Sequence, residues 1–197
     1  IKEEITYMRN LLSTKDQRQL RLMEILIQNR NWIRLHALAE KLGCTERILK
    51  NDLNELRTAF PNIDIQSSVN GIMIDLDVNT SVEDVYQYFL AHSQSFQLLE
   101  YMFFNEGLPI YRTIENLHSS SANLYRLGRN ITKTLSSQFQ IELSFTPTAI
   151  LGNETDIRYF FAQYFSERYY FLDWPFPDLP EENLTEFADF FYKITNY

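Results

Sequence analysis

Hydrophobic positions between residues 35 and 60 repeat with the spacing of α-helices, in two runs separated by Gly43. The first run predicts a short helix because its apolar residues follow the i, i+3, i+4, i+7 pattern; they are Leu35, Leu38, Ala39 and Leu42. Gly43 stands where a left-handed cap would end that helix, and Thr45 offers a hydroxyl to cap the next one. The second helix should end before Pro61, and the residues that it is expected to bury are Ile48, Leu49, Leu53, Leu56 and Phe60.

After Pro61 the pattern changes to alternation, which predicts β-strands. Apolar and polar residues alternate over 63–65 and 72–75, and Asn70-Gly71 between them is typical of a tight hairpin. Trp32-Ile33 predicts a short third strand beside this hairpin, with the tryptophan as a plug of the core. Two helices joined by a tight turn and followed by a hairpin form a winged helix-turn-helix. This motif presents its second helix to the DNA major groove.

The same order of features returns further along the chain. A shift of 75 positions aligns capping and apolar residues, in the pairs Leu42 with Leu117, Thr45 with Ser120, Leu49 with Leu124 and Leu56 with Ile131. A second long helix should therefore follow Ser120, with Gly128 at the position of Leu53. Alternation from 139 to 145 and a turn at Thr146-Pro147 predict a second hairpin. Because the whole order recurs, we interpret the chain as two winged helix-turn-helix domains in tandem, at 1–78 and 79–152.

Most of the remaining chain is predicted to be helical. Capping boxes formed by Thr14 with Gln17 and by Thr80 with Glu83 each mark a helix start, and Ser93-Gln94-Ser95 marks a break between two helices. A helix rich in aromatic rings is expected to follow Asn153. Packing on the second winged helix is the favoured role of its rings, and a subunit interface is the alternative. The fold class is therefore mostly α with small β-hairpins.

Charge is unevenly distributed along the 197 residues, whose net charge is −8. Residues 15–58 carry nine Lys and Arg against six Asp and Glu, and residues 110–140 carry four bases against one acid, so each segment has a net charge of +3. Residues 59–109 and 141–197 each have a net charge of −7. The two positive segments coincide with the two predicted helix-turn-helix motifs. This distribution argues against indiscriminate nucleic-acid binding and favours directed sites.

Two sets of polar residues face away from the predicted buried stripes, and we expect both to contact duplex DNA. The first set comprises Thr45, Arg47, Lys50, Asn51 and Asn54, and the second comprises Ser120, Ser121, Tyr125, Arg126 and Arg129. Arg, Lys and Asn can hydrogen-bond base edges or hold phosphates. Base contacts are expected mainly from the first set and phosphate contacts mainly from the second. A solvated helix face is the alternative for each set.

The tip of the first hairpin is polar but carries no base. Its residues Ser67, Ser68 and Asn70 can donate only neutral hydrogen bonds to DNA, so we expect this wing to adjust orientation rather than supply affinity. A solvent-exposed turn that makes no DNA contact is the alternative.

Four segments of the sequence resemble Mga-type transcriptional regulators of Gram-positive bacteria. They are Leu-Gly-Cys-Thr-Glu-Arg at 42–47, Ser-Ser-Val-Asn-Gly-Ile at 67–72, Tyr-Met-Phe-Phe-Asn-Glu-Gly at 101–107 and, most specifically, the block 152–174. The resemblance implies an activator of virulence or sugar-linked genes, with two helix-turn-helix domains followed by regulatory domains of the sugar phosphotransferase type. On this resemblance, residues 153–197 would contain a connecting helix and the start of a helical regulatory domain, whose regulatory histidines would lie beyond Tyr197.

Other functions find less support in the sequence. His36, His92 and His118 are far apart and lack partners at metal-ligand spacing, and no catalytic or phosphate-cradling motif is present, so we expect no cofactor, metal or enzyme activity. A single cysteine, Cys44, favours a reducing, cytoplasmic location, and no segment is apolar enough to predict a membrane span. Because the chain opens on Ile1, we expect a piece of a longer protein, and self-association is a further expectation. The alternatives are a winged-helix module that binds an acidic protein, and an accessory domain of an enzyme whose active site lies elsewhere.

Overall fold

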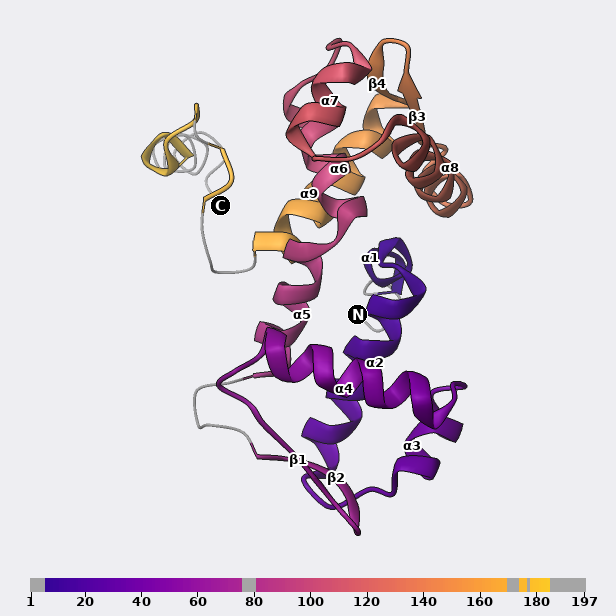
Figure 1. The fold of residues 1–197 in the computed structure, drawn as a ribbon. Helices are drawn as coiled ribbons and strands as arrows, with labels where there is room; N and C mark the ends of the chain where they lie inside the picture. Colours follow the sequence, from indigo (N-terminus) through magenta and orange to yellow (C-terminus); the bar gives the residue numbers. More distant parts are fainter. Residues whose placement is uncertain (1–5, 76–80, 170–173, 177, 185–197) are drawn as a thin grey trace.

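The computed structural model describes residues 6–75, 81–169, 174–176 and 178–184 (Figure 1). These residues form two winged helix-turn-helix units, drawn at the bottom and top of Figure 1, which are joined by helices. The predicted fold class, mostly α with two small hairpins, is confirmed. Within the described ranges, none of the helices combines the length and apolar character needed to span a bilayer.

The lower unit contains the predicted helices and hairpin. Its elements are α2 (Thr14–Asn29), α3 (Leu35–Lys41), α4 (Glu46–Ala59), β1 (Asp64–Ser68) and β2 (Gly71–Asp75). Gly43 has a φ of 61° in the turn between α3 and α4. The Thr45 hydroxyl accepts a hydrogen bond from the Ile48 N–H at 3.3 Å and so caps α4, as predicted. Ile48 itself is 39% exposed, so its predicted burial is wrong, whereas the neighbouring Leu49 is fully buried.

The hairpin is antiparallel and carries the predicted third strand, but two details differ from the prediction. Ile33 forms a bridge with Ile72, while Trp32 is 37% exposed and is not a core plug. Ser68 pairs with Gly71, so Val69-Asn70 forms the turn and Gly71 is the first residue of β2. Gly71 faces the Ile33 backbone, which explains why a glycine stands in the strand rather than at the centre of the turn.

The upper unit repeats the lower one 75 residues later. It consists of α6 (Gln94–Phe104), α7 (Ile110–Asn116), α8 (Ser121–Ser136), β3 (Glu142–Phe145) and β4 (Thr148–Leu151). α3 begins at residue 35 and α7 at residue 110, while α4 begins at residue 46 and α8 at residue 121. The backbone hydrogen bond from Cys44 to Ala39 returns as the bond from Ser119 to Ile114. His118 has a φ of 46° at the position that corresponds to Gly43, so the left-handed turn is preserved without glycine. The predicted repeat is confirmed.

The upper wing packs on its helix more closely than the lower wing does. Gly128 of α8 occupies the position of Leu53 in α4, and the buried ring of Phe145 lies against it: a Cβ at residue 128 would stand 2.5 Å from that ring. The same ring meets Tyr125 edge-on, with 5.1 Å between centroids. A glycine in the middle of a helix is therefore explained by packing, because the ring occupies the space of the missing side chain.

Three further helices connect the units. α5 (Val82–His92) runs between them, α1 (Thr6–Leu11) lies against α8, and α9 (Glu154–Tyr169) packs on α5 (Figure 1). The rings of α9 also pack against α6, as the sequence favoured: Tyr164 stacks on Phe96 at 5.1 Å and donates a hydrogen bond to its carbonyl at 2.8 Å. Residues 170–173 and 185–197, where the end of the ring-rich helix and the start of a regulatory domain are expected, lie outside the described residues.

Both predicted capping boxes are displaced by one residue. Ser13, not Thr14, caps α2 by accepting a hydrogen bond from the Asp16 N–H. Ser81 caps α5 in a capping box with Asp84, whereas Thr80 lies outside the described residues. Adjacent Ser and Thr residues both satisfy the sequence pattern, and only the position of the first helical turn selects between them.

Candidate nucleic-acid interface

All ten side chains predicted to contact DNA are exposed. They are Thr45, Arg47, Lys50, Asn51, Asn54, Ser120, Ser121, Tyr125, Arg126 and Arg129. The structure does not gather them into one site. Instead it distributes them over two helices, α4 and α8, each of which turns an apolar stripe inward and its polar face outward.

The outward-facing bases of α4 are unpaired, whereas two of its three acids, Asp52 and Glu55, contact bases of α2; the third, Glu46, is exposed and lies 3.7 Å from His36. Arg47 and Lys50 form no ion pair with any residue that the structure describes. Asp52 is 2% exposed and accepts two hydrogen bonds from Arg18 of α2, from Nε at 2.6 Å and from Nη2 at 3.1 Å. Lys15 of α2 contacts Glu55 at 2.5 Å. On the exposed face of α4 the two unpaired bases outnumber the one exposed acid, Glu46, so the face has an excess of positive charge, which suits a polyanion.

The same pairs shift the pKa values of the groups that they join. Hydrogen bonding to Asp52 raises the pKa of the Arg18 guanidinium, and hydrogen bonds from Lys15 and Gln19 lower the pKa of Glu55. α2 and α4 thus remain tied by charged groups at neutral pH. Because the Asp52 carboxylate is buried, this pair also fixes how α4 is presented.

Arg57, which is not among the residues predicted to contact DNA, joins α4 to the first wing. From the last turn of α4 its Nε donates to the Ile65 carbonyl at 2.9 Å, and its Nη2 donates to the Ser67 hydroxyl at 2.5 Å. Its Nη1 donates to Asn54 Oδ1 at 3.2 Å. Arg57 therefore connects the recognition helix to the first wing, and it places a positive charge beside a wing tip that was expected to have none nearby.

This contact also restricts what Asn54 can recognise. A bidentate contact to adenine needs both the carbonyl oxygen and the amide group of asparagine. Because Asn54 Oδ1 accepts from Arg57, the side chain is held with its oxygen toward Arg57, and its amide group is the part best placed to donate to a phosphate or a base acceptor. The Asn51 side chain forms no hydrogen bond with any residue that the structure describes, so its oxygen and its amide group are both available for a base edge.

The α8 face is organised around Arg126. Asn123 Oδ1 accepts from Arg126 Nη2 at 2.7 Å, so the guanidinium is oriented by a neutral partner and keeps its charge. Tyr125 is 42% exposed, and its ring packs edge-on against the ring of the wing residue Phe145. Thr132, at the position that corresponds to Arg57, accepts a hydrogen bond from the Leu143 N–H at 3.1 Å. In both units one side chain at the same helical position connects the recognition helix to the first wing strand.

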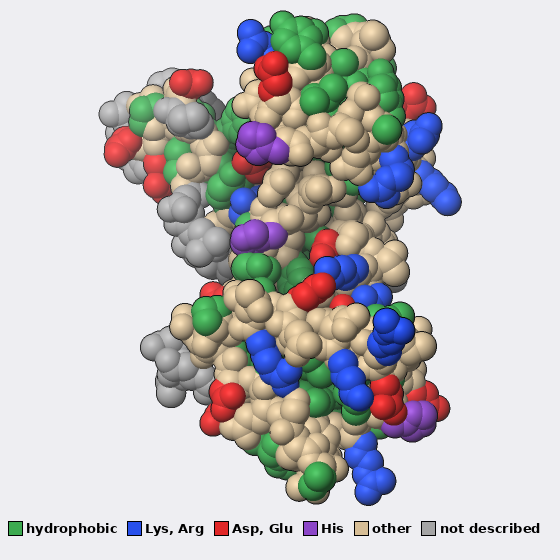
Figure 2. Space-filling model, in the orientation of Figure 1, with side chains coloured by type: hydrophobic (Ala, Val, Ile, Leu, Met, Phe, Trp, Pro, Cys, Tyr) green, Lys and Arg blue, Asp and Glu red, His purple; other side chains and the backbone are tan. Residues whose placement is uncertain are grey.

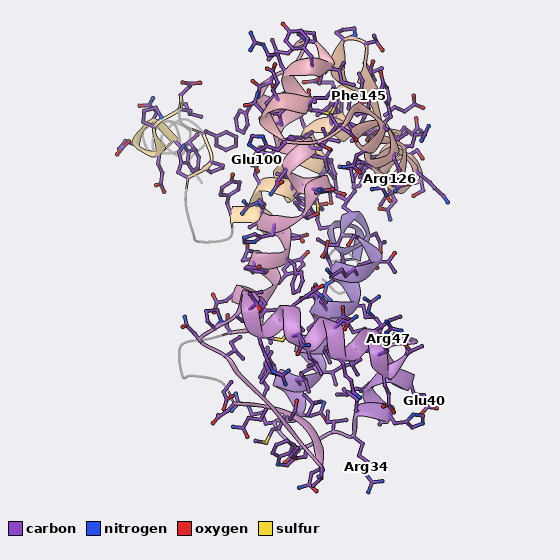
Figure 3. The ribbon with its side chains drawn as sticks, in the orientation of Figure 1. Arg34, Glu40, Arg47, Glu100, Arg126 and Phe145 are labelled. Atoms are coloured by element: carbon purple, nitrogen blue, oxygen red, sulfur yellow. The ribbon has the colours of Figure 1, made fainter. Side chains whose placement is uncertain are left out.

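The two helices present their bases on the same side of the molecule. Figure 3 labels Arg47 on the lower unit and Arg126 on the upper unit, both at the right-hand edge, and Arg34 projects outward at the start of α3. Figure 2 shows Lys and Arg side chains gathered over α8 and again across the lower unit, with acidic and basic side chains mixed between the groups. One extended ligand could therefore contact both helices.

Each hydroxyl of the first wing is already engaged. Ser67 accepts from Arg57, and Ser68 Oγ accepts from the Asn70 N–H at 3.1 Å. We expect that replacing Ser67 and Ser68 together by Ala weakens DNA binding by less than about 1 kcal/mol, the scale of a neutral hydrogen bond, and leaves the salt dependence unchanged. Titration of labelled duplex at several salt concentrations measures both quantities. A larger loss of salt dependence than Lys50→Ala causes would show that DNA docks on a different face.

Comparisons with known proteins place both units in described families. The family described as the M protein trans-acting positive regulator (MGA) HTH domain matches residues 13–72, and the family described as the Mga helix-turn-helix domain matches residues 78–165. A candidate trans-acting regulator of Streptococcus pneumoniae is 47% identical over 190 residues, which are 96% of this chain and 38% of that protein.

Two relatives from Bacillus anthracis are more distant. The capsule synthesis positive regulator AcpA is 23% identical over 88% of this chain and 36% of its own length. The anthrax toxin expression trans-acting positive regulator is also 23% identical, over 91% of this chain and 38% of its own length. The chain thus spans well under half the length of the relatives that it matches.

Proposed function

Because this chain belongs to the Mga family of transcriptional regulators, we propose that it binds duplex DNA through both winged helix-turn-helix units and thereby controls transcription. The members of this family are regulators and not enzymes. The observation that carries the proposal is the repeat of one recognition-helix geometry 75 residues apart, with unpaired bases on the same side of both units.

We assign different tasks to the two recognition helices. Arg47, Lys50 and Asn51 occupy the N-terminal half of α4, the end that enters the major groove in such motifs, and they have the chemistry to contact bases. In α8, Arg126 and Arg129 hold phosphates and set the register, aided by the hydroxyls of Ser120 and Ser121. The proposed domain limits stay at 1–78, 79–152 and 153–197.

A duplex that reaches both helices has to follow the surface between them. Acidic and basic side chains are mixed between the two basic groups, so this surface attracts phosphates less than either group does, and the proposal favours DNA that curves from one unit to the other. Sites that contain flexible pyrimidine–purine steps should therefore bind more tightly than stiff sites with the same base contacts.

Binding of labelled duplexes, followed by fluorescence anisotropy at about 50 and about 200 mM salt, tests the proposal. We expect a preferred sequence and a steep fall of affinity with salt. The alternative, a module that binds an acidic protein partner, requires that duplex DNA compete poorly for the same faces. Weak, salt-insensitive binding of every duplex would contradict the proposal.

The regulated genes are proposed from the relatives. Two of them are named as positive regulators, one of capsule synthesis and one of anthrax toxin expression, so we propose an activator of virulence genes, acting in the cytoplasm where its DNA lies. Control by sugar transport and self-association are parts of the same proposal for the whole protein. A promoter fusion that loses transcription when the regulator is deleted would support activation, and a gain would indicate repression.

Arg57 should act on DNA binding through position rather than contact. We expect Arg57→Ala to weaken binding to the preferred sequence more than to an unrelated sequence. The substitution removes the hydrogen bonds from α4 to Ile65 and Ser67 that hold the wing in a fixed position relative to the helix. Arg57→Lys keeps the charge but cannot form the three separate hydrogen bonds, so it should not restore discrimination. Competition assays with both sequences measure the ratio. Full rescue by lysine would show that only the charge of residue 57 matters.

A further inference from the structure

A cavity of about 640 Å³ lies where the two units meet, and it belongs to neither recognition surface alone. The start of α2, the junction of α5 with α6, and α8 all contribute to its wall. Ser13 and Ser93, the N-cap residues of α2 and α6, both line it. Two helix N-termini therefore converge on one cavity, each with the partial positive charge of its exposed N–H groups.

The start of α6 is buried but uncapped. Ser93 is 2% exposed, yet its side chain makes no capping hydrogen bond, and Ser95 is 7% exposed. The N–H groups of Gln94, Ser95 and Phe96 form no hydrogen bond with any residue that the structure describes. Ser95 and Phe96 are buried residues, and helix N-terminal donors at buried positions are costly unless an acceptor reaches them. The two serine hydroxyls and these N–H groups thus offer several donors at one end of the cavity.

One charged side chain on the wall, Arg126, is a base without an acidic partner among the described residues. Arg126 lines the cavity from α8 and is linked to the start of α6, because Asn123 accepts from Arg126 at 2.7 Å and donates to Gln94 Oε1 at 3.4 Å. Lys15 and Asp16 also line it; Lys15 contacts Glu55, and the Asp16 carboxylate accepts from the Ser13 hydroxyl at 2.7 Å. Because Glu55 neutralises Lys15, the attraction for an anion comes from the Arg126 guanidinium, which no described acid pairs with, and from the helix N-termini.

We propose that this cavity binds a phosphate-type oxyanion, held by the Ser93 and Ser95 hydroxyls, the first N–H groups of α6 and the Arg126 guanidinium. A tetrahedral oxyanion provides acceptors in several directions, which matches donors that arrive from a helix end and a facing side chain. The anion has two sources with the same chemistry: a backbone phosphate of bound DNA, or a small phosphorylated molecule. Only the DNA source rests on the proposed function.

Occupation of this site would couple the two units. α6 and α8 belong to the upper unit, while α2 belongs to the lower unit and its first turn forms the opposite wall. An anion bound between them stabilises this relative orientation, and the separation of α4 from α8 depends on that orientation. The site is thus suited to setting which spacing of DNA contacts the protein accepts.

Inorganic phosphate is the probe for the test, compared with chloride at equal ionic strength on the whole chain. We expect phosphate to shift the amide NMR signals of Gln94 and Ser95 and to raise the unfolding temperature. Ser93→Ala should unfold at the same temperature as the parent in chloride, since its hydroxyl makes no hydrogen bond. It should bind phosphate about tenfold more weakly, because a hydrogen bond to a charged group is lost.

Ser81→Ala is the matched control. It removes a serine that does cap its helix, so it should lower the unfolding temperature in chloride but leave phosphate affinity unchanged. Equal phosphate affinity in the parent and in Ser93→Ala, or no phosphate-specific shift at Gln94 and Ser95, would overturn the proposal.

Saturation with duplex DNA distinguishes the two sources. If DNA supplies the phosphate, duplex shifts the same amides, inorganic phosphate competes with it, and Ser93→Ala weakens DNA binding. If a small phosphorylated molecule is the ligand, duplex leaves these amides unchanged while phosphate still shifts them; both patterns support the site. A chain that binds phosphate here but binds no duplex would refute the proposed function and leave this inference standing.

Discussion

Gly71→Ala is expected to destabilise the protein by about 3–5 kcal/mol, a large share of the stability of an ordinary domain. A Cβ at this position would stand 2.1 Å from the Ile33 carbonyl oxygen and 2.8 Å from the Arg34 nitrogen, and both are backbone atoms that cannot rotate away. The φ of 125° adds strain of roughly 1–3 kcal/mol for any other residue. Moving the chain apart would also break the two hydrogen bonds between Ile33 and Ile72, at 2.8 and 2.9 Å.

Gly43→Ala is the control for this prediction, because Gly43 also has a positive φ but nothing lies within 4 Å of the added Cβ. It should cost only the left-handed penalty of about 1–2 kcal/mol. Urea unfolding followed by circular dichroism measures both variants. Equal losses would show that backbone conformation alone, and not the approach of the third strand, requires glycine at residue 71.

The sequence predicted the fold well where local chemistry determines it. Helix periodicity, the Gly43 turn and the Thr45 cap all act within a few residues, so each was visible without the structure. The second unit was harder to detect, because His118 performs the turn that glycine performs in the first. Only the recurrence of the whole order revealed it.

The predictions of burial are wrong where contacts between residues far apart in the sequence determine which side chains are buried. The periodicity predicts a buried Ile48 and does not predict a buried Asp52, yet Ile48 is 39% exposed and Asp52 is 2% exposed. The burial of Asp52 is explained by Arg18, which lies 34 positions away and forms a bidentate pair with it. No pattern within α4 could indicate that partner. Trp32 likewise resembled a core residue by its type alone.

The candidate site was predictable in its residues but not in its connections. Exposed bases on an amphipathic helix follow from periodicity, so Arg47 and Arg126 could be named from sequence. The role of Arg57 in joining helix and wing could not be predicted, because its contacts with Ile65 and Ser67 depend on how the wing folds back. The cavity between the units could not be anticipated at all, since it depends on how two similar domains pack.

Arg47→Ala and Arg126→Ala together are expected to weaken binding to a preferred duplex more than about 100-fold. If Arg47 contacts a base edge, its loss costs about 1–3 kcal/mol, and the loss of a charged phosphate contact at Arg126 costs a comparable amount. Because the two side chains lie on different units, their effects should add when one duplex spans both. Anisotropy titrations of the parent, both single variants and the double variant give the four affinities of a double-mutant cycle.

The single variants decide whether the units act together on one DNA molecule. If both units hold the same duplex, each single substitution costs its full share, roughly tenfold or more. If each unit binds a separate duplex, the loss of one contact leaves the other unit intact. Each single variant should then lose less than about twofold in affinity for duplex DNA, and only the double variant should bind poorly. Arg112→Ala provides the matched control, since this exposed arginine of α7 is 3.5 Å from Glu115 and its charge is already partnered. If both single variants kept nearly full affinity for duplex DNA while the double variant lost it, binding of one duplex by both units would be refuted, and the two units would bind DNA independently.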